Sequence, residues 1–119
     1  GSKKAVSNVL KKLGIDFQFV SRTKNENTIS YLDLKPQTIL ESKLIINTTP
    51  VGMYPKTQDA PDIPYSFITS EHLLFDLIYN PSETEFLKRG KQQGATIKNG
   101  LEMLQLQAEK SWEIWNNNK

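Results

Sequence analysis

The sequence contains no cysteine, which excludes disulfide bridges and thiolate metal sites and is typical of a reducing compartment. It also lacks an apolar run long enough to cross a membrane, and no signal-peptide pattern opens it. Neither sign of charge dominates, since the formal net charge is +2 over 119 residues, whereas a dedicated nucleic-acid binder concentrates basic residues on one face. The composition therefore predicts one small cytoplasmic domain with no membrane or nucleic-acid partner.

Helical and strand-like patterns alternate along the chain. Val6, Val9, Leu10 and Leu13 recur at helical spacing, which predicts a helix over residues 3–13 that Gly14 ends. Further helices are predicted over residues 36–41, 82–93 and 101–115, the second of them from the capping-box spacing of Ser82 and Glu85. Strands are predicted near residues 15–20, 29–32, 44–46, 73–79 and 95–97. This alternation predicts an α/β fold, a parallel sheet with helices on both faces.

Polar or glycine-containing groups follow four of the predicted strands, at residues 21–23, 47–49, 79–80 and 99–100. In parallel α/β sheets, ligands bind in the crevice beyond the carboxyl ends of the strands. Because these groups all follow strand ends, we expect them to share one site.

The group after the first predicted strand reads Ser21-Arg22-Thr23-Lys24. A fold that prefers NAD places an acid here, whereas a guanidinium pairs with the 2′-phosphate of NADP. The segment therefore favours NADP, although an ordinary solvated loop would look the same. Gly1-Ser2 precedes the first helix, as the end of a phosphate-binding glycine turn would, or as a remnant of cloning would.

Residues 47–53 combine Asn and Thr hydrogen-bonding groups with a glycine, which suits either a ribose contact or a plain turn. Met53 and Tyr54 are expected to anchor this loop on the core. Asp76 lies in an apolar run, so it is expected to be hydrogen-bonded or near a strand end. The single histidine, His72, is expected to have a surface or capping role, and no residue spacing suggests a metal site.

Together these segments resemble the C-terminal, NADP-binding domain of shikimate dehydrogenase over nearly the whole chain. The stretches that carry the resemblance are residues 1–6, 21–23, 47–55, 76–81 and 100–104, with 107–108. The resemblance implies NADPH-dependent reduction of 3-dehydroshikimate to shikimate in aromatic amino-acid biosynthesis. It also implies that residues 1–119 form a Rossmann-like domain that lacks its first strand and most of its glycine-rich loop.

The resemblance also implies roles for individual residues. Cofactor contacts are implied for Gly1 and Ser2 at the phosphate loop, for Ser21, Arg22, Thr23 and Lys24 near the 2′-phosphate, for Asn47, Thr48 and Thr49 along the ribose, and for Leu77, Gly100 and Met103 near the nicotinamide. Substrate contacts are implied for Tyr79 and Gln107; from the helical pattern alone, Met103 and Gln107 could equally be core and surface.

In this family the catalytic Lys and Asp belong to an N-terminal domain that this sequence does not contain, so we expect the chain alone to be inactive. The strands near residues 15–20 and 44–47 would flank the first strand, and we expect their gap to be closed by direct pairing, by a segment of another chain or by a reordered sheet. A homo-oligomer through exposed strand edges or the last helix is also expected. The alternatives are a non-catalytic nucleotide-binding or regulatory module and a quinate/shikimate dehydrogenase.

Overall fold

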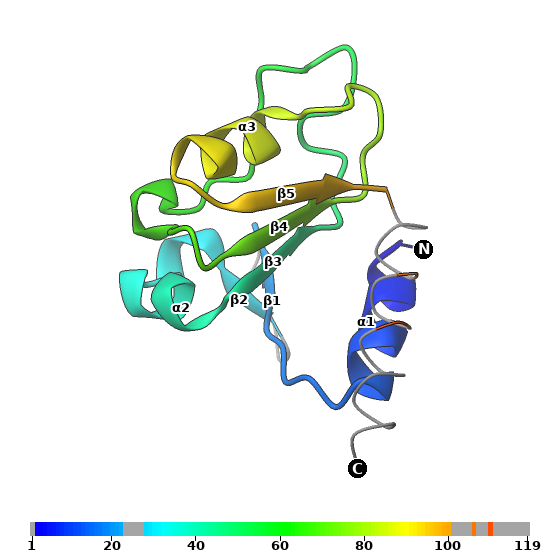
Figure 1. The fold of residues 1–119 in the computed structure, drawn as a ribbon, viewed down its shortest axis with the longest axis vertical. Coiled ribbons are helices and arrows are strands. Elements are labelled where there is room, and N and C mark those ends of the chain that lie inside the picture. Colours follow the sequence, from blue (N-terminus) through cyan, green and yellow to red (C-terminus); the bar gives the residue numbers. More distant parts are fainter. Residues whose placement is uncertain (1, 23–27, 101–105, 107–109, 111–119) are drawn as a thin grey trace.

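The computed structural model describes residues 2–22, 28–100, 106 and 110 (Figure 1). Its helices are α1 (Ser2–Lys12), α2 (Pro36–Glu41) and α3 (Glu85–Gln92), with the short 3-10 turns η1 (Tyr31–Asp33) and η2 (Tyr65–Phe67). Its strands are β1 (Phe19–Ser21), β2 (Thr28–Ser30), β3 (Leu44–Asn47), β4 (Leu73–Asp76) and β5 (Thr96–Asn99). Most of the helix predicted over residues 101–115, including Met103 and Gln107, falls outside the described residues.

The five strands form two separate parallel sheets, with the orders β1-β2 and β3-β4-β5. In the larger sheet Asn47 pairs in register with Asp76, and Asp76 with Asn99, so the three carboxyl ends lie level. Among the described residues β1 pairs with β2 and not with β3, so the structure shows neither direct pairing across the gap nor a reordered sheet there. Both of those expectations are wrong, while a single chain does not test closure by another chain.

Helices cover both faces of the three-stranded sheet, which confirms the predicted α/β architecture (Figure 1). On one face Val6 and Leu10 of α1 pack against Phe75, with Leu44 and Ile46 at the border. On the other face α2 and α3 cover a cluster around the fully buried Leu74; its buried members are Ile39, Ile63, Ile68, Leu74, Phe86, Leu87 and Ala95. Successive side chains of β3 and β4 therefore pack into two cores, one on each face of the sheet.

The first and third helices end as the sequence predicted, at glycines in the left-handed region. Gly14 has φ +70° and Gly94 has φ +92°. In each case the glycine N–H and the next N–H bond back to carbonyls of the last turn, as with Gly14 to Lys11 (3.0 Å) and Ile15 to Leu10 (3.0 Å). Ile15 thus completes the helix cap, and β1 begins only at Phe19 rather than at residue 15.

Two other predicted boundaries are wrong for local reasons. β4 ends at Asp76 rather than near residue 79, because the Ile78 N–H turns back to the Asp76 carboxylate at 3.0 Å. The cap of α3 is Thr84 rather than Ser82, since the Thr84 hydroxyl accepts the Leu87 N–H at 3.3 Å. Both corrections trace to side chains that hydrogen-bond to nearby backbone groups. None of the helices described has the length and apolarity that a membrane span requires.

Candidate functional site

A buried carboxylate organises the carboxyl edge of the larger sheet. Asp76, the last residue of β4, has no exposed surface. Its carboxylate accepts hydrogen bonds from the Thr84 hydroxyl (2.6 Å), the Ile78 N–H (3.0 Å) and Asn47 Nδ2 (3.2 Å). Burial raises the pKa of Asp76, and these three hydrogen bonds oppose that rise. This confirms the expected hydrogen-bonded position at a strand end, and it ties β3, β4 and α3 together.

Asn47 forms the turn that follows β3. Its Nδ2 also donates to the Val51 carbonyl at 3.3 Å, while its Oδ1 accepts from the Thr49 N–H (3.1 Å) and hydroxyl (2.7 Å). Both amide hydrogens of this nearly buried side chain are therefore used within the protein. The geometry gives Asn47 the turn-forming role, and its contact with a ribose stays a prediction.

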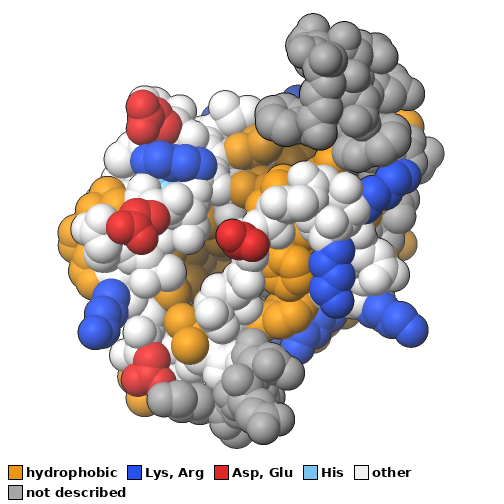
Figure 2. All heavy atoms as spheres, turned by 90° about the horizontal axis from the view of Figure 1, so that it is seen from below, with side chains coloured by type: hydrophobic (Ala, Val, Ile, Leu, Met, Phe, Trp, Pro, Cys, Tyr) orange, Lys and Arg blue, Asp and Glu red, His pale blue; other side chains and the backbone are white. Residues whose placement is uncertain are grey.

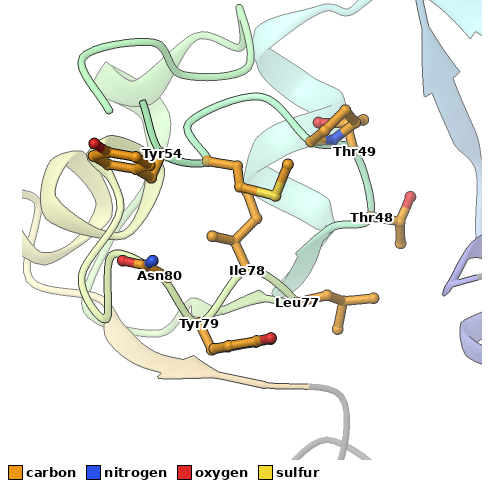
Figure 3. A pocket seen from close by; sticks show the side chains of 9 residues that line it. Thr48, Thr49, Tyr54, Leu77, Ile78, Tyr79 and Asn80 are labelled. Atoms are coloured by element: carbon orange, nitrogen blue, oxygen red, sulfur yellow. The ribbon is translucent and has the colours of Figure 1, made fainter. Parts of the chain in front are cut away.

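A pocket of about 510 Å³ opens between the loop after β3 and the loop after β4 (Figure 3). Its lining residues are Thr48, Thr49, Pro50, Met53, Tyr54, Leu77, Ile78, Tyr79 and Asn80. The two loops are joined by a hydrogen bond from the Tyr54 N–H to the Asn80 carbonyl at 3.3 Å. The structure thus brings together Thr48, Thr49, Leu77 and Tyr79, which the sequence had assigned to one site.

The pocket wall carries large side chains that remain exposed to solvent. Tyr79 is 80% exposed, Tyr54 68% and Met53 48%. The expectation that Met53 and Tyr54 anchor the loop on the core is therefore wrong. Hydrogen bonds through Asn47 hold the start of the loop instead, which frees these side chains to face the pocket.

A second hollow, of about 600 Å³, adjoins this pocket and shares Pro50, Met53 and Tyr54 with it. Arg22, exposed just beyond β1, lines it together with Lys56 and Arg89. Arg89 is held in place by Glu85, 3.1 Å away, and lies over the Tyr65 ring. Three cations therefore border one hollow, with Asp59 as the acidic residue in its lining.

The remaining predicted site residues lie elsewhere. Ser21 ends β1 in register with Ser30, and Gly100 donates its N–H to the Asp76 carbonyl at 2.8 Å. Ser2 begins α1. The rest, Gly1, Thr23, Lys24, Met103 and Gln107, fall outside the described residues.

Four pocket residues were not assigned to the site from the sequence: Pro50, Met53, Tyr54 and Ile78. Asn80 was expected at the site as part of the group at residues 79–80, and it lines the pocket. The signal that could have found most of these four is the long, proline-rich loop after residue 47, because long loops in compact domains are usually functional.

The single histidine, His72, is buried and structural. Its Nδ1 accepts the Thr69 N–H at 3.0 Å and its Nε2 lies 2.7 Å from the Ile39 carbonyl. Among the described residues, no three His, Asp or Glu side chains are grouped to hold a metal ion.

Comparison with known proteins adds a consistent result, although no family model matches the chain. The chain is 43% identical to the shikimate dehydrogenase (NADP(+)) of Methanococcus maripaludis over 110 residues, 91% of this chain and 38% of that protein. The solved shikimate dehydrogenase of Aquifex aeolicus superposes with a TM-score of 0.70 at 31% identity, covering 98% of this chain and 45% of that one. A solved shikimate dehydrogenase in complex with NADP+ superposes with a TM-score of 0.54 at 33% identity, covering 93% of this chain and 36% of that one.

The chain therefore spans less than half the length of each of these three proteins. Over nearly all of its own length, it is homologous to shikimate dehydrogenases and shares their Rossmann-like α/β fold.

Proposed function

We propose that residues 1–119 form the NADP-binding domain of a shikimate dehydrogenase, which reduces 3-dehydroshikimate to shikimate with NADPH. The observation that carries this proposal is the pocket at the carboxyl edge of the sheet. Three residues expected to contact the cofactor, Thr48, Thr49 and Leu77, line it together with Tyr79, which is expected to contact the substrate. A site for both molecules at the ends of parallel strands is what a dinucleotide-dependent reductase requires.

The residues present fit an NADP molecule. The Thr48 hydroxyl can hydrogen-bond a ribose, and Leu77 is proposed to position a nicotinamide ring mainly through its backbone. In the adjoining hollow, Arg22 can pair with a 2′-phosphate, and Lys56 and Arg89 add positive charge around it. Thr23 and Lys24 belong to the same proposed phosphate contact.

The N-terminal end of α1 suits a pyrophosphate. Helix N-termini carry unpaired N–H groups and a partial positive charge. The first turn of α1 contains no acidic residue, and Lys3 and Lys4 lie within it. We therefore keep Gly1 and Ser2 as proposed phosphate contacts, and Gly100 and Met103 as proposed neighbours of the nicotinamide.

When bound, NADPH supplies the hydride for this reduction. On the substrate side, the exposed phenol of Tyr79 can donate a hydrogen bond to a hydroxyl or carboxylate, and Gln107 is proposed to help it. The proton-transferring Lys and Asp are expected in a separate N-terminal domain, so residues 1–119 alone are proposed to be inactive. A cytoplasmic location and a homo-oligomer are part of the same proposal.

A domain exchange tests this function. Residues 1–119 replace the matched segment of the Methanococcus maripaludis relative, and NADP reduction with shikimate is followed by absorbance. We expect turnover that depends on both shikimate and NADP. A folded chimera without such turnover would contradict the proposal.

The matched variant is Arg22→Glu in the same chimera. A lost charge-assisted pair of about 1.5–3 kcal/mol corresponds to a weakening of NADP binding by roughly 10- to 100-fold. Binding of NAD, which has no 2′-phosphate, should change far less. Equal losses for both cofactors would place Arg22 away from the 2′-phosphate.

A further inference from the structure

Asp76 is a buried ionisable residue to which the proposed reaction gives no role. Charged side chains usually lie at the surface, as Figure 2 shows for one face of this molecule, whereas Asp76 has no exposed surface. Burying a carboxylate is costly unless hydrogen bonds satisfy it. The donors that satisfy this one come from segments at the carboxyl edge of the sheet, so the carboxylate is placed to act on the pocket there.

Four segments of the chain meet at Asp76. Asn47 Nδ2, at the end of β3, lies 3.2 and 3.3 Å from the two carboxylate oxygens. The Ile78 N–H donates to Oδ1 at 3.0 Å, and the Thr84 hydroxyl donates to Oδ2 at 2.6 Å. The main-chain carbonyl of Asp76 accepts the Gly100 N–H at 2.8 Å. One residue therefore joins the ends of all three strands of the larger sheet to the start of α3.

The bond from Ile78 fixes the direction of the Leu77 carbonyl. The Leu77 C=O and the Ile78 N–H belong to one trans peptide unit, in which they point in opposite directions. Because the Ile78 N–H points at the Asp76 carboxylate, the Leu77 carbonyl points away from it. The N–H of Leu77 is fixed as well, since it donates to the Asn47 carbonyl at 3.2 Å. Asp76 thus sets the backbone that is proposed to position the nicotinamide.

The same carboxylate fixes the opposite wall of the pocket through Asn47. A carboxylate can only accept, so it holds the amide nitrogen of Asn47 toward itself and leaves Oδ1 on the other side. There Oδ1 accepts the N–H and the hydroxyl of Thr49, at 3.1 and 2.7 Å. Figure 3 shows Thr49 and Tyr79 on opposite sides of the pocket. Asp76 therefore acts on both walls at once.

An amide of the same shape could not make these contacts. In asparagine one of the two oxygens is replaced by an NH2 group, which only donates. Asn47 Nδ2 lies within 3.3 Å of both oxygen positions of Asp76, so an NH2 group at either position would face another donor. The arrangement therefore requires a carboxylate at this residue.

We propose that Asp76 is a positioning residue for the hydride transfer. Its carboxylate turns the Leu77 carbonyl toward the nicotinamide and holds the loop of Thr49 opposite, so it sets the angle at which cofactor and substrate meet without touching either. This inference rests on the function proposed above and adds to it a residue that acts through its neighbours.

The test introduces Asp76→Asn into the chimera described above. We expect kcat per NADPH-binding site to fall by about 10- to 100-fold, because small displacements of reacting groups cost this much. Binding of adenosine 2′,5′-bisphosphate, which has no nicotinamide, should stay unchanged. A loss of folded protein alone cannot produce this split, since turnover is counted per binding site. Weakened binding of the bisphosphate together with kcat would overturn the inference.

The matched control is Thr84→Ala. It removes a hydrogen bond from the same carboxylate and weakens the same region, but it leaves the bonds from Ile78 and Asn47 in place. Its kcat per site should therefore stay close to that of the unmodified chimera. Equal losses of kcat in the two variants, or an unchanged kcat in Asp76→Asn, would overturn the inference.

A measurement on the unmodified chimera does not depend on how the variants fold. The NMR resonance of an isotope-labelled Leu77 carbonyl carbon should move when NADPH is added and stay in place when adenosine 2′,5′-bisphosphate is added. No movement with NADPH would overturn the inference. A chimera without turnover would contradict the proposed function and this inference together, whereas full turnover in Asp76→Asn would contradict the inference alone.

Discussion

The two sheets of this chain differ in how completely their residues are buried. In β3-β4-β5, Leu74 and Phe75 are almost completely buried, both faces carry helices, and a hydrogen-bonded network closes the carboxyl edge. In β1-β2 every residue except Thr28 is only partly buried, and local contacts such as Lys3 over the Phe19 ring and the Phe17–Phe19 ring pair hold the strand. The difference teaches that the larger sheet is the better packed of the two.

The largest predicted effect tests this contrast with a matched pair of truncations. Leu74→Ala removes a fully buried side chain from the core between the sheet and α3, and should lower the free energy of unfolding by about 3–5 kcal/mol. Val20→Ala, at a half-buried position of β1, should cost about 1 kcal/mol. Urea denaturation of both variants checks the comparison. Equal losses would show that the two sheets are equally well packed.

The next effect concerns the hydrogen-bonded network at the carboxyl edge of the larger sheet. Thr84→Ala removes the cap of α3 and the shortest hydrogen bond to Asp76, so it should cost about 2–3 kcal/mol. Thr84→Ser keeps the hydroxyl and is the control, with an expected loss of about 1 kcal/mol from the missing methyl group. Thermal unfolding of the two variants separates these contributions. If serine and alanine cost the same, the hydroxyl does not hold the network.

This network also marks the limit of what the sequence predicts. Apolar periodicity located α1, and continuous apolar runs located the strands at Leu44 and Leu73, because these patterns are local. The cap at Thr84 was missed because the capping-box spacing favoured Ser82, and no local pattern shows that the Thr84 hydroxyl is also bonded to Asp76, eight residues away. Prediction of the site from the sequence was limited in the same way. Thr48 and Tyr79 were placed at one edge by the rule for strand ends, but the exposed wall of Met53 and Tyr54 depends on how Asn47 folds the loop.

A smaller loss of stability is expected when a methyl group is added to the core beside the larger sheet. Gly90, inside α3, packs directly on Leu74, and a Cβ at this position would overlap Leu74 Cδ2. Gly90→Ala gains up to about 1 kcal/mol of helix propensity but should lose about 1–3 kcal/mol to overpacking, a net destabilisation near 1 kcal/mol. Gly90→Ala combined with Leu74→Ala should relieve the overlap, so the double variant should be more stable than the sum of the two losses. Strict additivity in this cycle would argue against the contact.

The last prediction concerns pH, which should act on the larger sheet through Asp76. Burial raises the pKa of Asp76 above its ordinary value of 3.8, so the folded state retains its proton at a pH where the unfolded state has lost it. The stability contributed by the protonated form is therefore full below about pH 4 and is lost as the pH rises through the folded pKa, after which it stays level. Asp76→Asn cannot titrate, so the stability of the unmodified chain relative to this variant should fall across that window. Because the cause is burial and not surface charge, the fall should persist at high salt. A relative stability that instead rises with pH would mean that the hydrogen bonds from Thr84, Ile78 and Asn47 outweigh burial.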